Sequence, residues 1–146
     1  MPRTNRTAVQ KVFQLSLGAL CAFGSLTACN KDDDDDLSKA DILSSTRWKT
    51  TVVKDSVGVD VTAANTGFVG LATYNRNGTY EFFNLDGTPR GDSGYWALTA
   101  DESKRILYSL TRSYTRVVDI VELRSNLFTY KTVANGKTVW VEHVPL

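Results

Sequence analysis

Beyond residue 42 the chain alternates apolar and polar positions and is rich in β-branched and aromatic side chains. Turn-forming residues interrupt this pattern about every ten residues, which is typical of the short strands of an all-β domain. Asn77-Gly78 and Asn135-Gly136 indicate hairpins, because both residue types accept the positive φ of a tight turn. The pattern predicts eight strands, at residues 46–54, 68–74, 79–84, 94–99, 105–111, 115–124, 127–133 and 137–144.

No long segment has helical periodicity, and only residues 39–44 are expected to form a short turn of helix. Eight consecutive strands joined by short turns predict an all-β fold, an antiparallel up-and-down barrel over residues 42–146. Closing the barrel removes exposed strand edges, and an eight-stranded interior holds side chains or one small ligand. A two-sheet β-sandwich is the competing architecture.

The first 28 residues predict a secretory signal peptide. Basic residues begin it, and the apolar run of about 13 residues that follows is shorter than the 18 or more that a membrane span needs. Its end, Leu26-Thr27-Ala28-Cys29, resembles the lipobox of bacterial lipoproteins. This resemblance implies cleavage before Cys29, a diacylglyceryl thioether on its thiol, and acylation of the new amino terminus by chains such as palmitate.

Residues 29–41 predict a lipidated acidic tether ahead of the barrel. The five adjacent carboxylates from Asp32 to Asp36 repel one another, so the segment is expected to be extended and hydrated. It is either a hydrophilic spacer or an export signal, since a lysine and several acids after the lipid cysteine resemble the signal of surface lipoproteins in Bacteroidetes. The anchor is expected in the outer membrane, and an export signal would place the domain on its outer face.

The cysteine positions and the charge balance exclude several classes of function. Cys21 would leave with the leader and Cys29 would carry lipid, so the mature chain is expected to have no disulfide and no thiolate chemistry. The whole chain has 17 basic and 16 acidic residues, without the basic face that nucleic-acid binding requires. We expect a monomer whose partners are the membrane, through the lipid, and a small molecule or glycan.

Five segments of the predicted barrel carry a family resemblance, at residues 45–51, 80–84, 105–107, 127–131 and 141–145. In this order and spacing they resemble an uncharacterised family of bacterial lipoproteins, the domain of unknown function DUF4822. Trp48 and Gly94-Tyr95-Trp96 also resemble bacterial lipocalin-like domains. The resemblance implies a small β-barrel and no assigned reaction. True lipocalins have Gly-x-Trp on the first strand, where this chain has Thr46-Arg47-Trp48, so a lipocalin calyx is not transferred.

The sequence offers no catalytic or metal-binding arrangement, and we expect neither an enzyme nor a cofactor. His143 is the only histidine, and it is expected to be a half-buried strand residue, because one histidine does not build a zinc site or a triad alone. The segment Gly91-Asp92-Ser93-Gly94 is interpreted as a flexible turn.

Two acidic residues lie inside the predicted strand 115–124. Asp119 and Glu122 fall on opposite faces of a regular strand, and both faces are otherwise apolar. One of these acids is therefore expected among apolar neighbours, where a carboxylate needs a paired cation. The candidate partners are Arg105, Arg112, Arg116 and Lys131. Such a pair would either close the barrel or orient a ligand in a small pocket with aromatic walls.

The predicted function is that of an outer-membrane lipoprotein whose non-catalytic barrel binds a small ligand, a glycan or an envelope component. The alternative is a protein-interaction or inhibitor lipoprotein that makes its contacts through loops at residues 60–66 and 86–94. The candidate ligand-binding residues are Tyr108, Arg116, Asp119, Tyr130 and Trp140.

Overall fold

A computed structural model describes residues 37–146 of the chain. The predicted signal peptide, the lipidation site Cys29 and the acidic run 32–36 lie outside the described residues. No helix within 37–146 has the length and apolar character needed to cross a membrane.

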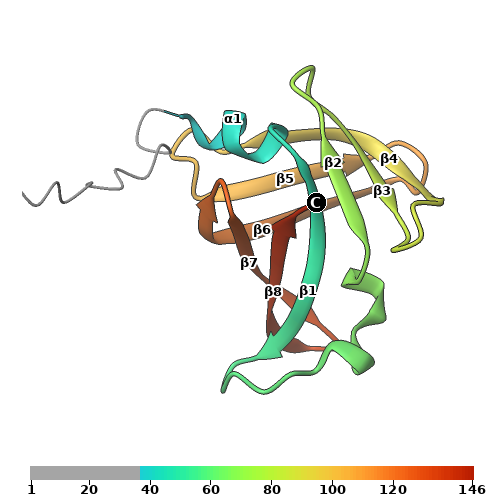
Figure 1. Ribbon diagram of the computed structural model, residues 1–146, viewed down its shortest axis with the longest axis vertical. Helices are drawn as coiled ribbons and strands as arrows, with labels where there is room; N and C mark the ends of the chain where they lie inside the picture. Colours follow the sequence, from blue (N-terminus) through green and yellow to red (C-terminus); the bar gives the residue numbers. More distant parts are fainter. Residues whose placement is uncertain (1–36) are drawn as a thin grey trace, which may run out of the picture. The chain divides into compact units, whose positions relative to one another are not determined.

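The described residues form a closed antiparallel barrel in which each strand pairs with the next and the last strand pairs with the first (Figure 1). This arrangement confirms the predicted eight-stranded up-and-down barrel in place of the two-sheet sandwich. The strands are β1 (Arg47–Asp55), β2 (Leu71–Tyr74), β3 (Thr79–Phe83), β4 (Pro89–Leu98), β5 (Lys104–Ser109), β6 (Tyr114–Arg124), β7 (Leu127–Ala134) and β8 (Lys137–Pro145). Both Asn-Gly pairs form turns, with Gly78 and Gly136 at positive φ.

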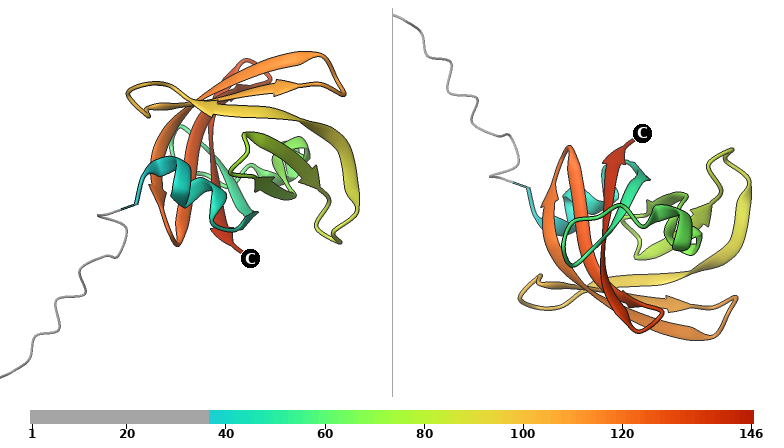
Figure 2. Two further views of the ribbon diagram at one scale, coloured as in Figure 1. Left: turned by 90° about the horizontal axis from the view of Figure 1, so that it is seen from above. Right: turned by 90° about the horizontal axis from the view of Figure 1, so that it is seen from below.

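The short helix predicted before the first strand is α1 (Lys39–Ser44), which lies at one end of the barrel (Figure 1 and Figure 2). Ser38 caps its amino end by accepting a hydrogen bond from the backbone of Asp41. Its apolar residues Ile42 and Leu43 are buried in the core, and the indole of Trp48 donates a hydrogen bond to the carbonyl of Leu43 at 2.8 Å. The helix therefore belongs to the barrel core.

Alternating side chains of the strands fill the barrel, as the period-two pattern of the sequence requires. Trp48 of β1 packs edge-on against Phe128 of β7, with ring centroids 5.7 Å apart. On β5 the inward positions are Arg105, Leu107 and Ser109, and all three are buried. An arginine thus occupies a position in the core alternation where an aliphatic residue is usual.

Strand β4 begins earlier than predicted. Residues 91–94, interpreted above as a flexible turn, lie inside β4 and pair with β3 and β5. A register shift between Glu81 and Phe83 admits the extra residues, and Gly91 accommodates a φ of 63°. The turn is therefore confined to residues 85–87, the strand begins at Pro89, and the side chain of Asp92 is buried inside the barrel.

Strand β2 is shorter than predicted, because a 3-10 helix (Thr66–Phe68) occupies the start of the expected strand. This helix follows another short 3-10 helix, Thr62–Ala64, within the connection from β1 to β2. The connection places Gly67 and Phe68 in the wall of a pocket.

The prediction that one acid of β6 is buried was wrong. The register shifts between Ile120 and Glu122, so the regular alternation behind the prediction does not hold through the strand. The side chain of Asp119 is 41 % exposed and pairs with Lys104 and Lys131 on neighbouring strands. Glu122 is 38 % exposed and pairs with Arg124.

Candidate functional site

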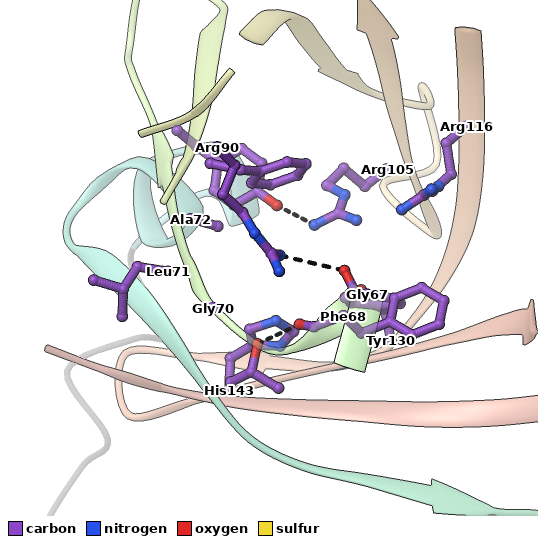
Figure 3. A pocket seen from close by; sticks show the side chains of 13 residues that line it. Gly67, Phe68, Gly70, Leu71, Ala72, Arg90, Arg105, Arg116, Tyr130 and His143 are labelled. Atoms are coloured by element: carbon purple, nitrogen blue, oxygen red, sulfur yellow. Dashed lines mark hydrogen bonds between the residues drawn. The ribbon is translucent and has the colours of Figure 1, made fainter. Parts of the chain in front are cut away.

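A small chamber of about 40 Å³ opens into the barrel interior, and we call it the inner chamber. All eight strands contribute residues to it, and so does the connection between β1 and β2 (Figure 3). Three arginines on adjacent strands line it, Arg90 of β4, Arg105 of β5 and Arg116 of β6. None of the described residues that line the inner chamber is acidic.

Arg105 is the deepest of the three cations, with only 2 % of its surface exposed. Its guanidinium donates a hydrogen bond to the hydroxyl of Tyr74 and lies over the rings of Tyr130, at 4.6 Å, and Phe128, at 5.4 Å. Ring faces stabilise a cation, but each contributes only about 0.5–2 kcal/mol. The buried Nε of Arg105 has no hydrogen-bond partner within residues 37–146. The charge is thus held by aromatic faces, and a donor is left unpaired.

The tyrosines around Arg105 do not neutralise it. Burial raises the pKa of Tyr74 to about 12, although the charge of Arg105 acts in the opposite direction. Burial also raises the pKa of Tyr130. Both phenols therefore stay protonated at neutral pH, and the guanidinium has no anionic partner among them.

Arg90 and Arg116 add two further charges at the side of the inner chamber. Arg90 donates to the side-chain oxygen of Asn84 at 3.2 Å and to the carbonyl of Gly67 at 3.3 Å. Arg116 lies over the ring of Tyr114 at 5.1 Å and over that of Phe68 at 5.7 Å. Neither arginine forms an ion pair with a described carboxylate, so three guanidinium groups share one space without an acid (Figure 3).

His143 forms another part of the chamber wall. It is almost fully buried, rather than half-buried as predicted, and stacks on the rings of Phe128 and Tyr130. Its Nδ1 donates a hydrogen bond to the carbonyl of Phe128 at 3.3 Å. Burial, reinforced by the charge of Arg105, lowers its pKa to about 3. The imidazole is therefore neutral at physiological pH and is not poised to act as a general base.

A larger depression of about 480 Å³ adjoins the inner chamber, and we call it the outer basin. Asp92 lies in its wall and is the buried carboxylate of the barrel. It accepts hydrogen bonds from Ser109 at 2.8 Å, from Tyr114 at 2.7 Å and from Tyr80 at 3.1 Å. The Nε of Arg112 lies 4.0 Å from the same carboxylate. Hydroxyl groups thus satisfy the acid and leave the inner arginines unpaired.

Within the described residues, no group of three or more histidine, cysteine, aspartate or glutamate side chains is placed to hold a metal ion. Guanidinium groups form short, charge-assisted hydrogen bonds with carboxylate and phosphate oxygens. The donor set of the inner chamber therefore matches an oxyanion.

The five residues selected from the sequence are not all in one place. Arg116 and Tyr130 line the inner chamber. Tyr108 is half-exposed, Asp119 lies among lysines at a partly exposed position, and Trp140 lies between the inward residues Val139 and Val141, so it faces outward. These three residues lie outside the inner chamber and the outer basin.

Sequence reasoning missed Arg90 and His143 as site residues and considered Arg105 only as an ion-pair partner. The useful signal was the phase of β5, because Arg105 shares its face with Leu107 and Ser109. The chamber is indicated by an arginine that occupies an inward position of its strand and has no acidic residue as its cross-strand neighbour. On β6 the residue opposite Arg105 is Val118.

Comparison with known protein families identifies the family of this chain. A family model described as "Domain of unknown function (DUF4822)" matches residues 40–146, which cover α1 from its second residue and the whole barrel. No curated protein matches the chain.

Proposed function

The chain belongs to the DUF4822 family, whose description gives no activity, and we propose from the site itself that the barrel is a binding module for a small oxyanion. The ligand is a carboxylate or phosphate group held in the inner chamber, and the function is binding rather than catalysis. The observation that supports this proposal is Arg105, a buried cation whose Nε has no partner among residues 37–146, in a chamber that none of their acids lines.

Electrostatics favour such a ligand strongly. Removing a charged group from water costs several kcal/mol unless a counter-charge and hydrogen bonds replace the lost hydration. Arg105 carries its charge at any physiological pH, and its neighbours Tyr74, Tyr130 and His143 are neutral there. An oxyanion would supply the missing counter-charge and an acceptor for the Nε. Arg90 and Arg116 would add donors from the side.

The proposal predicts that oxyanions stabilise the purified protein. Phosphate or acetate should raise the Tm relative to chloride at the same ionic strength, because a ligand that binds only the folded state stabilises it. At about 100 times Kd the gain is about 2.7 kcal/mol, equivalent to about 10 °C in a domain of this size. Differential scanning fluorimetry over a range of anion concentrations measures the effect.

Two arginine variants, one in the chamber and one outside it as the matched control, test the location of the site. Arg116→Gln removes a chamber cation and should weaken the stabilisation at least tenfold in anion concentration. Arg76→Gln removes an arginine whose charge is exposed and 3.7 Å from Asp41, and it should leave the response unchanged. An equal response in both variants, or no difference between oxyanion and chloride in the parent, would contradict the proposal.

We further propose that the protein is a lipoprotein of the outer membrane, anchored through acyl chains on Cys29 and displayed by the acidic tether. The support is the resemblance of Leu26-Thr27-Ala28-Cys29 to a lipobox. The acylation that a lipobox implies would supply two or more acyl chains, which give the stable anchoring that a single chain does not.

Replacing the lipid-bearing cysteine tests the anchor separately from the binding site. Cys29→Ser should move the protein from the membrane to the soluble fraction or leave its leader uncleaved. Cell fractionation and intact-mass measurement of the mature protein detect both results, and Cys21→Ser, inside the leader, is the matched control. A Cys29→Ser protein that matures and fractionates like its parent would rule out the anchor.

A further inference from the structure

The outer basin continues the binding site beyond the inner chamber. The two spaces share four lining residues, Gly67, Phe82, Arg90 and Arg116, so they lie side by side. The chamber, at about 40 Å³, has room for a group the size of a few water molecules, since each water needs about 10–15 Å³. The basin, at about 480 Å³, falls in the range of about 300–1,000 Å³ typical of small-molecule sites. A ligand whose acid group fills the chamber would extend its body into the basin.

The basin wall is polar and carries both signs of charge. Arg90 and Arg116 lie at its boundary with the chamber, and Arg112 contributes a side chain that is 54 % exposed. Asp92 and Tyr114 supply oxygen acceptors, and Asn84 supplies an amide. Apolar side chains come only from Phe82 and Pro89 among the described lining residues. This composition does not suit a hydrocarbon chain, because burying the polar groups against it would leave them unpaired.

The charge arrangement also restricts which polar groups the body carries. A second acid would face the carboxylate of Asp92, and an amine would face Arg90, Arg112 and Arg116. A hydroxyl group both donates and accepts, so it can pair with the acid and with the guanidinium donors without repulsion. Asp92 already accepts hydrogen bonds from three hydroxyl groups, those of Tyr80, Ser109 and Tyr114.

We propose that the ligand is a hydroxylated acid of about monosaccharide size, such as a sugar acid or a sugar phosphate. Its acid group binds in the inner chamber against Arg105 and Arg116, and its hydroxyl-bearing body occupies the outer basin. This inference rests on the proposed anion-binding function and adds to it the chemistry of the body. Arg112 would contact the hydroxyl-bearing body of the ligand, and Arg105 would contact its acid group.

Isothermal titration calorimetry of the purified protein with five probes tests this assignment. The probes are acetate, glucuronate, inorganic phosphate, glucose 6-phosphate and glucose. Either glucuronate should bind at least tenfold more tightly than acetate, or glucose 6-phosphate at least tenfold more tightly than phosphate. The pair that shows the gain identifies the acid group, and glucose alone should show no measurable binding, because it lacks the anion.

A pair of exposed arginines gives the matched variants. Arg112→Gln should reduce the tenfold ratio to about threefold or less, because it removes a donor from the basin. Arg124 has a side chain that is 58 % exposed and a carboxylate neighbour, Glu122, at 3.0 Å, so it resembles Arg112 in exposure and pairing. Arg124→Gln should leave the ratio unchanged.

The outcomes separate this inference from the function on which it rests. If acetate and phosphate bind and hydroxylated acids gain nothing, the anion site stands and the hydroxylated-acid assignment is wrong. An equal loss of the ratio in both variants would also overturn the assignment. If no probe binds, the anion-binding function and the inference both fail.

Discussion

Replacing Arg105 with methionine should abolish oxyanion binding and at the same time stabilise the ligand-free barrel, by about 1–3 kcal/mol. Both effects come from the same group. The guanidinium is buried without a carboxylate partner in the described part of the chain, so the ligand-free protein bears the desolvation of a cation that the rings of Tyr130 and Phe128 offset only in part. Methionine is unbranched and fills a similar space without charge. Urea denaturation in chloride buffer measures the stability, and calorimetry with phosphate or acetate measures the binding.

Arg105→Lys distinguishes charge from geometry. Lysine keeps the positive charge but has neither the planar fork nor an Nε donor in this position. The affinity of the Arg105→Lys protein for the anion should fall at least tenfold, without the gain in stability expected of the methionine variant. If Arg105→Met instead lowers the free energy of unfolding by more than about 2 kcal/mol, Arg105 is a structural residue of the core and the anion-binding account is wrong.

Gly94→Ala should destabilise the barrel by about 3 kcal/mol, the largest loss expected from adding a single methyl group. A Cβ at this position would lie 2.0 Å from the backbone oxygen of Tyr108 and 2.9 Å from the backbone nitrogen of Leu110. Both atoms belong to the backbone, so they cannot move aside as a flexible side chain does, and β4 would have to separate from β5. Thermal and urea denaturation measure the loss.

Gly67→Ala is the matched control for this substitution. Nothing lies within 4 Å of a Cβ built there, and its φ is not in the left-handed region. Its free energy of unfolding should change by no more than about 0.5 kcal/mol. If the two alanine variants are equally stable, strands β4 and β5 approach one another less closely than the structure shows.

Most of the barrel follows from local signals in the sequence. Strands β5 to β8 have clear runs of β-branched and aromatic residues, and Asn135-Gly136 fixes the last hairpin. The start of β4 was not predictable in this way, because Gly91 and Gly94 are typical of turns. Gly94 is present there for another reason, the close approach of two strands. In the sequence, a glycine required by the close approach of another strand cannot be told from a glycine required by a turn.

The site was less predictable than the fold, because it depends on which face each strand turns inward. Burial of Asp119 or Glu122 would require regular alternation along β6, and the register shift between Ile120 and Glu122 breaks that alternation. Arg105 obeys the alternation of β5, but its burial without an acid is evident only when all neighbouring strands are placed. Arg90 reaches the chamber through a part of β4 that the sequence did not identify as strand.

Anomalous diffraction can locate an anion bound to the barrel. Selenate has the tetrahedral shape of phosphate and scatters anomalously, so crystals of the protein soaked in selenate would locate it without ambiguity. We predict an anomalous peak in the inner chamber, with a selenate oxygen about 2.7–3.2 Å from the Nε of Arg105. Peaks confined to exposed arginines and lysines, with the chamber unoccupied at saturating selenate, would contradict the account.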